Sequence, residues 1–172
     1  MPNLMMIKGD WDQTAQNFVD KQQSYSKWHG EKYFGLTVDD HLYFLFILNK
    51  TEYDYVPEEK WVKVSVIADW KQMRGAVTDR AQRRKYKHIG IYKAMRWCFE
   101  DLKYDGMYGM VRENDKSVYM FMDHMNGART KSLGKCTSQG VPLHHWLFTK
   151  KEYEKDSRHY FLENANNSIL DF

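Results

Sequence analysis

The chain of 172 residues is 42% hydrophobic and 16% aromatic, which fits one ordinary domain with a packed core and excludes global disorder. Its 26 Lys and Arg residues and 23 Asp and Glu residues leave a formal net charge of +3, which makes no case for a general polyanion binder. The two cysteines, Cys98 and Cys136, are too few for a disulfide framework, and the apolar run at 42–48 is too short to cross a bilayer. We therefore expect a soluble, cytoplasmic protein without a secretory signal or a membrane partner.

The first half of the chain predicts a helix followed by three strands. These elements are expected at residues 11–28, 33–38, 42–48 and 61–69. Asp10 or Asp12 is placed to cap the helix, and Gly30 to end it. The second strand is apolar throughout, which is typical of a strand buried on both faces, and Asp39 and Asp40 form the tight turn before it.

The second half of the chain predicts two helices and two strands in alternation. They are expected at residues 83–102, 107–111, 114–125 and 141–148. In the first of these helices Ile91, Met95 and Cys98 repeat at helical spacing and form one apolar face. This order predicts a single α/β domain over residues 1–150, with a mixed central sheet flanked by helices, and a polar C-terminal extension over 151–172.

The net charge is concentrated in one segment. Residues 80–99 hold seven basic side chains and no acidic one, so the rest of the chain is net −4. Most of these cations precede His88, at the start of the predicted helix, where unpaired N–H groups already make the backbone electropositive. A bound anion is the simplest reason for the cluster, and a solvated face opposite acidic residues is the alternative. Nucleic acid also fits the charge, with Tyr86 as a stacking surface, but no known nucleic-acid-binding motif occurs in the sequence.

Segment 83–92 and the sequence after it resemble the GNAT superfamily of N-acetyltransferases. In that family a loop and the helix after it carry the sequence motif Gln/Arg-x-x-Gly-x-Gly/Ala. Here Lys85 stands in the place of the first residue, His88 in that of the first glycine and Gly90 in that of the second. The family's Asn-x-x-Ser/Ala helix follows the next strand, and residues 114–117 match this pattern.

The resemblance implies a GNAT fold and an acetyltransferase that uses acetyl-CoA as cosubstrate without a metal. It implies that the CoA phosphates are bound by seven residues of the two matching segments: Arg83, Arg84, Lys85, Lys87, His88, Gly90 and Asn114. The acceptor would be an amine, on a small molecule or a protein.

Acetyl transfer to an amine requires a base for the amine and an acid for the departing thiolate. Asp69 and Glu113 follow the two strands expected to run parallel at the centre of the sheet, where such strands part, and they are the candidate bases. Each can instead cap a strand end or a helix. The family often has a tyrosine as the acid in the helix after the Asn. That position falls near Phe121, and the nearest hydroxyl belongs to Tyr119.

The basic, Gly-poor loop is also similar to small GNAT-like proteins of tailed bacteriophages, including an internal virion protein of T7-like phages. This resemblance implies an alternative function, in which a noncatalytic GNAT-fold protein acts in virion assembly or binds a host protein. Its partners would be phage structural or host proteins, and its location the virion or the host cytoplasm.

The adjacent pair His144 and His145 predicts no metal site. Neighbouring residues of a strand point to opposite faces of the sheet, so these two rings cannot readily chelate one ion.

Overall fold

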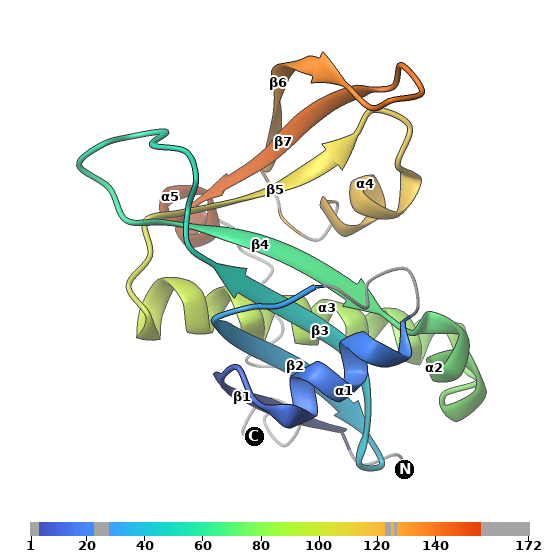
Figure 1. The fold of residues 1–172 in the computed structure, drawn as a ribbon. Helices are drawn as coiled ribbons and strands as arrows, with labels where there is room; N and C mark the ends of the chain where they lie inside the picture. Colours follow the sequence, from blue (N-terminus) through green and yellow to red (C-terminus); the bar gives the residue numbers. More distant parts are fainter. Residues whose placement is uncertain (1–3, 23–27, 123–124, 126, 156–172) are drawn as a thin grey trace.

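The computed structural model describes residues 4–22, 28–122, 125 and 127–155, apart from the side chains of Trp70, Ser117, Met120 and Phe121. Their centre is a seven-stranded mixed sheet of order β1-β2-β3-β4-β5-β7-β6. The strands are β1 (Leu4–Asp10), β2 (Lys32–Val38), β3 (His41–Asn49), β4 (Trp61–Ala68), β5 (Gly106–Arg112), β6 (Arg129–Cys136) and β7 (Pro142–Thr149). The helices are α1 (Gln13–Lys21), α2 (Trp70–Ala76), α3 (Arg80–Arg96), which continues as a π-helical turn (Trp97–Asp101), α4 (Lys116–Met122) and α5 (Lys150–Lys155) (Figure 1).

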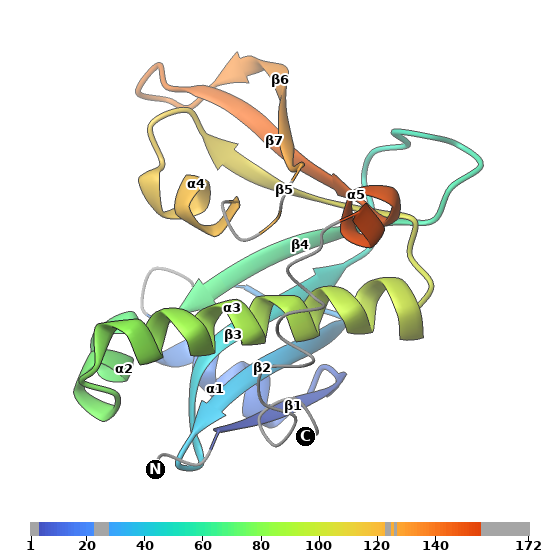
Figure 2. The ribbon, with the colours of Figure 1, turned by 180° about the vertical axis from the view of Figure 1, so that it is seen from behind.

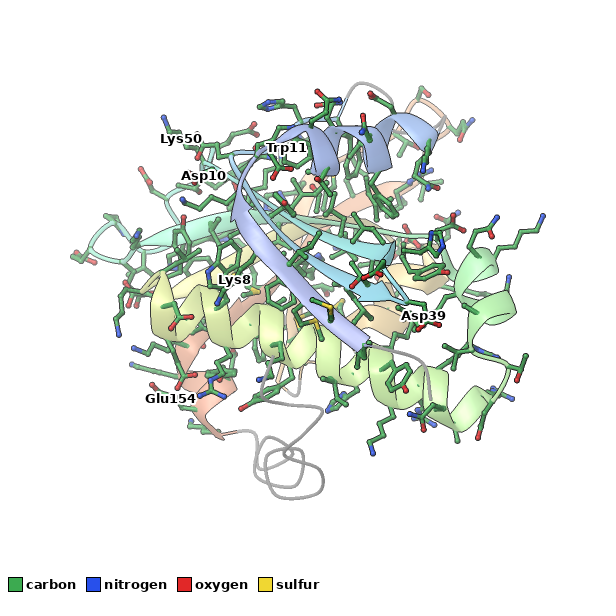
Figure 3. The ribbon with its side chains drawn as sticks, turned by 90° about the horizontal axis from the view of Figure 1, so that it is seen from below. Lys8, Asp10, Trp11, Asp39, Lys50 and Glu154 are labelled. Carbon is green, nitrogen blue, oxygen red and sulfur yellow. The ribbon has the colours of Figure 1, made fainter. Side chains whose placement is uncertain are left out.

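Helices cover both faces of the sheet. Figures 2 and 3 show α3 across one face and α1 on the other. On the α3 face the core includes Phe46 of β3, Val62 of β4 and Met95 of α3, and on the α1 face it includes Phe18 of α1 packed with Leu45 of β3. The predicted single-domain α/β fold with a mixed sheet is confirmed.

The central strands lie where their apolar sequences predicted them. β3 is buried at six consecutive positions because strands flank it on both sides and helices cover both faces. The turn between β2 and β3 has positive φ at Asp39 (49°) and Asp40 (65°), a conformation that aspartate tolerates better than most residues. β4 and β5 pair in parallel, as the strand–helix–strand order predicted.

The two edge strands were not predicted. Within the described residues, β1 pairs with β2 alone and β6 with β7 alone. All but one residue of β6 are exposed, so its sequence carries no apolar alternation, and its pairing comes from the neighbouring strand rather than from burial.

The helix boundaries differ from prediction at several points. α1 begins at Gln13 with Asp12 as its cap and ends at Lys21, while the rest of its predicted span includes residues outside those described. α2 was not among the predicted elements, and Asp69 caps it. α3 begins at Arg80, three residues early, because the Asp79 carboxylate accepts hydrogen bonds from the N–H groups of residues 81 and 82.

Candidate functional site

The two central parallel strands part soon after they meet. β4 and β5 pair at Trp61–Gly106, Val62–Met107 and Lys63–Tyr108, and the described structure records no pairing between them beyond this point. The rest of β4 stays paired with β3, and the rest of β5 with β7. Figure 1 shows the two arrows diverging toward their carboxyl ends. Beyond Lys63 and Tyr108 the facing backbone edges of the two strands are therefore not paired with each other in the described structure.

The basic residues of the predicted phosphate site lie inside α3 rather than in a loop before it. Arg83 is at the fourth position of the helix, and both Nη1 hydrogen bonds recorded for it, to the carbonyls of Val77 and Thr78, are 2.8 Å long. Arg84 is exposed, Lys85 is partly exposed, and burial lowers the pKa of Lys87. The helix thus presents cationic side chains along its first two turns.

His88 and Gly90 occupy the third turn of α3. Gly90 is buried, and a Cβ there would lie 3.4 Å from the Leu36 side chain of β2, which is ordinary van der Waals contact. The N–H groups of residues 81 and 82, which an anion at the helix start would use, are bonded to Asp79. Two of the helix-start amides are therefore already bonded, and the cationic side chains offer the further anion contacts of this segment.

Asp69 lies directly after β4. Its backbone N–H donates to the carbonyl of Tyr43 at 2.7 Å, and its carboxylate accepts from the N–H of Gln72 at 3.2 Å, which caps α2. The capping role considered from the sequence is thus present. The same carboxylate also lines a cavity of about 540 Å³ on the α1 side of the sheet.

Glu113 and Asn114 follow β5 and are exposed. The Glu113 N–H donates to the carbonyl of Pro142 in β7, and it is Asp115 rather than Asn114 whose carboxylate accepts from the Val118 N–H in the first turn of α4. Tyr119 of α4 is partly buried against the core. Asp69 directly follows β4 and Glu113 directly follows β5, so each comes after the carboxyl end of one of the two diverging strands.

A second cluster of polar and aromatic groups could not be read from the sequence. The loop at 50–60 lies over β5 and β7, where Tyr53 and Tyr55 surround His145, which is only 1% exposed. Burial lowers the pKa of His145 to about 4. On the other face of β7, Nε2 of His144 is buried and has no hydrogen-bond partner among the described residues. As neighbours in β7, His144 and His145 lie on opposite faces of the sheet. Among the described residues no group of three potential metal ligands occurs.

The cavity beside Asp69 draws its residues from α1, β3 and α2. No sequence signal joined these segments, because their proximity depends on how α1 packs on the sheet.

The fold is that of GNAT acetyltransferases. A chimera of the Vibrio cholerae spermidine N-acetyltransferase SpeG with hSSAT superposes with a TM-score of 0.59 at 11% identity, covering 88% of this chain and 99% of that one. The Vibrio cholerae enzyme in complex with CoA and spermine has a TM-score of 0.58 at 12% identity, with 87% and 98% covered. A GNAT-family acetyltransferase from Bacillus anthracis has a TM-score of 0.55 at 12% identity, with 85% and 95% covered.

No protein-family model and no curated protein matches the sequence. In the part of the chain that the structure describes, no helix is both long and apolar enough to cross a membrane.

Proposed function

We propose that the protein is an acyl-CoA-dependent N-acetyltransferase that transfers an acetyl group from acetyl-CoA to an amine. The observation that carries this proposal is the early divergence of β4 and β5, which leaves two facing backbone edges beyond Lys63 and Tyr108. Open strand edges offer N–H and C=O groups in a row, and these suit the amides of an extended pantetheine chain.

The cationic side chains of α3 fit the phosphates of the cosubstrate. Arg84 and Lys85 lie in the first two turns of the helix, and Lys87 follows within one turn. Because Asp79 occupies two of the helix-start amides, we assign phosphate binding mainly to these side chains, with Arg83 holding the preceding loop and Gly90 lying where α3 packs on β2. His88 and Asn114 stay in the proposed site as flanking polar contacts.

The chemistry that acetyl-CoA supplies is an acyl group on a good leaving thiolate. Asp69 and Glu113, at the ends of the diverging strands, are the groups we propose to accept the proton from the amine, directly or through water. Tyr119 is the candidate hydroxyl for the proton that the thiolate takes up. The cytoplasm is the proposed compartment, in keeping with two free cysteines.

Thermal unfolding with and without acetyl-CoA tests the cosubstrate. A ligand that binds only the folded state raises the melting temperature, so millimolar acetyl-CoA should stabilise the native protein. The double variant Arg84→Glu, Lys85→Glu should lose this shift. A matched charge change on exposed lysines away from α3, Lys50→Glu with Lys151→Glu, should keep it. If millimolar acetyl-CoA leaves the melting temperature of the native protein unchanged, the proposed acetyltransferase activity is refuted.

A noncatalytic GNAT-fold protein of phage-type origin is the second candidate. The observation that favours it is the Asp79 cap, because its carboxylate takes amides that a phosphate would use. Such a protein would act in virion assembly or bind a host partner through the basic surface of α3. It should then copurify with phage particles in a fixed copy number and show no stabilisation by acetyl-CoA.

A further inference from the structure

The two edges of the sheet differ in how they resist pairing with a further strand. β6 forms one edge, carries one arginine and two lysines, and shifts its register with β7 between Ser132 and Cys136. Charged side chains and such irregularities are the usual means by which an edge strand avoids further pairing. β1 forms the other edge, and its register with β2 continues from Leu4 to Asp10 without a shift.

The first half of β1 is apolar on both faces of the sheet. Leu4 and Met6 pack with the core on the α3 side, Ile7 packs with the core on the α1 side, and Met5 is 41% exposed. Residues 4–7 include no charge and no proline, which would hinder pairing at an edge. Figure 3 shows β1 in front of the sheet, between α1 and α3. Among the residues that the structure describes, no strand pairs with the outer side of β1.

The two charged residues of β1 already have counterions within the chain. Lys8 forms an ion pair with Asp101 at 3.7 Å, and Asp10 forms one with Lys32 at 2.5 Å. The apolar residues 4–7 therefore remain to select a partner for this edge. A second copy of the chain offers a strand of the same length that is apolar in the same places, so it continues the core on both faces of the sheet.

We propose that the protein forms a dimer in which β1 pairs antiparallel with β1 of a second copy, with Met6 opposite its own copy. A two-fold axis perpendicular to the sheet relates the two strands and makes the contact self-complementary. Directly opposite residues of an antiparallel pair point to the same face, so this symmetry requires one residue to lie opposite itself.

The sequence of β1 selects the residue on the axis. With Met6 there, Met5 lies opposite Ile7, so the central pairs are all apolar. With Ile7 there, Met6 would lie opposite Lys8, which would place an apolar side chain against an ammonium group. With Met5 there, the ladder would be shorter, because β1 begins at Leu4. β2 and β3 separate β1 from β4, so the dimer leaves the diverging strands outside the contact.

Disulfide cross-linking tests the register. The exposed Cys136 is first replaced, Cys136→Ser, whereas Cys98 is buried and stays. Opposite residues of an antiparallel pair have Cα atoms about 4.5–5.5 Å apart, within the range that a disulfide spans. Met6→Cys should therefore form a covalent dimer with oxidised glutathione. Lys8→Cys is the matched control on the same face of β1, because its two thiols would lie four positions apart, roughly 13 Å along the strand, and should not cross-link.

The oligomeric state tests the edge itself. In light scattering the native protein should have twice the mass of one chain. Met5→Lys changes an exposed side chain, so the variant should keep its cooperative thermal unfolding while its dimer dissociation constant rises about tenfold or more. Thr130→Lys makes the same kind of change on the exposed β6 edge and should leave the dimer intact.

Three results would each overturn the β1 dimer. The first is a native protein that stays monomeric at every accessible concentration, as expected if another part of the chain or a different protein covers the edge. The second is cross-linking of Lys8→Cys as efficient as that of Met6→Cys. The third is a dimer that Met5→Lys does not weaken. All these measurements are made without acetyl-CoA, so their outcome is independent of the proposed acetyltransferase activity.

Discussion

The hydroxyl of Tyr55 forms a hydrogen bond with Nδ1 of His145, and this contact joins the loop at 50–60 to strand β7. The two residues are 90 positions apart in the sequence. Tyr53, Tyr55 and Tyr108 pack their rings around the imidazole, and Lys131 lies over the ring of Tyr55. The loop is therefore attached to the sheet through a buried polar contact inside an aromatic cluster.

Removing the hydroxyl from this contact should destabilise the fold. In Tyr55→Phe the ring remains but the buried Nδ1 of His145 loses its partner, which should lower the free energy of unfolding by about 1–3 kcal/mol. Urea unfolding at pH 7 measures the change. Tyr53→Phe is the control, since among the described residues no bond to its hydroxyl is recorded although its ring also contacts His145. An equal loss of unfolding free energy in the two variants would refute a stabilising role for the Tyr55–His145 hydrogen bond.

Stability should fall as the pH is lowered from 6.5 to about 4. Burial lowers the pKa of His145 from 6.5 to about 4, so in this interval the unfolded chain binds a proton at His145 that the folded chain does not. Above pH 6.5 the neutral ring makes its full contribution to the free energy of unfolding. This contribution is lost as the pH falls toward 4, by about 3 kcal/mol in all. Urea unfolding across this interval should show a shallower decline in His145→Gln than in the native protein. Parallel curves would exclude His145 as the source.

The stability of the protein should respond differently to an apolar substitution at His144 and at its neighbour His145. Nε2 of His144 is buried without a partner in the part of the chain that the structure describes, so His144→Leu should leave the stability unchanged or raise it by about 1 kcal/mol. His145→Leu should lower it, because the Tyr55 hydroxyl would lose its partner. Comparing the melting temperatures of the two variants tests this contrast, and a loss in His144→Leu as large as that in His145→Leu would contradict it.

Two glycines should respond differently to alanine. A Cβ at Gly109 of β5 would collide with the indole of Trp146 on β7, so Gly109→Ala should cost about 1–3 kcal/mol. A Cβ at Gly75 of α2 would meet nothing within 4 Å, so Gly75→Ala should raise stability by up to about 1 kcal/mol through helix propensity. Thermal unfolding measures both changes. A neutral Gly109→Ala would show that Trp146 moves aside easily.

Local patterns determined the central elements. The apolar run in β3 predicted a strand buried on both faces, and the spacing of Ile91, Met95 and Cys98 predicted the buried face of the helical segment they share. These features are readable because burial acts on each residue along a regular period. The same reasoning did not find β6, whose exposed residues carry no such period.

The candidate site depended on contacts that no local pattern contains. The sequence placed Asp69 and Glu113 after two central strands, but only the pairing in the folded sheet shows that these strands part after three paired positions. Likewise, the charge cluster of α3 was evident in the sequence, while the Asp79 cap and the cavity between α1 and Asp69 were not. The sequence by itself determined which segments are buried and which are cationic. Only the tertiary structure decided which polar groups face one another, because that depends on side chains brought together from distant elements.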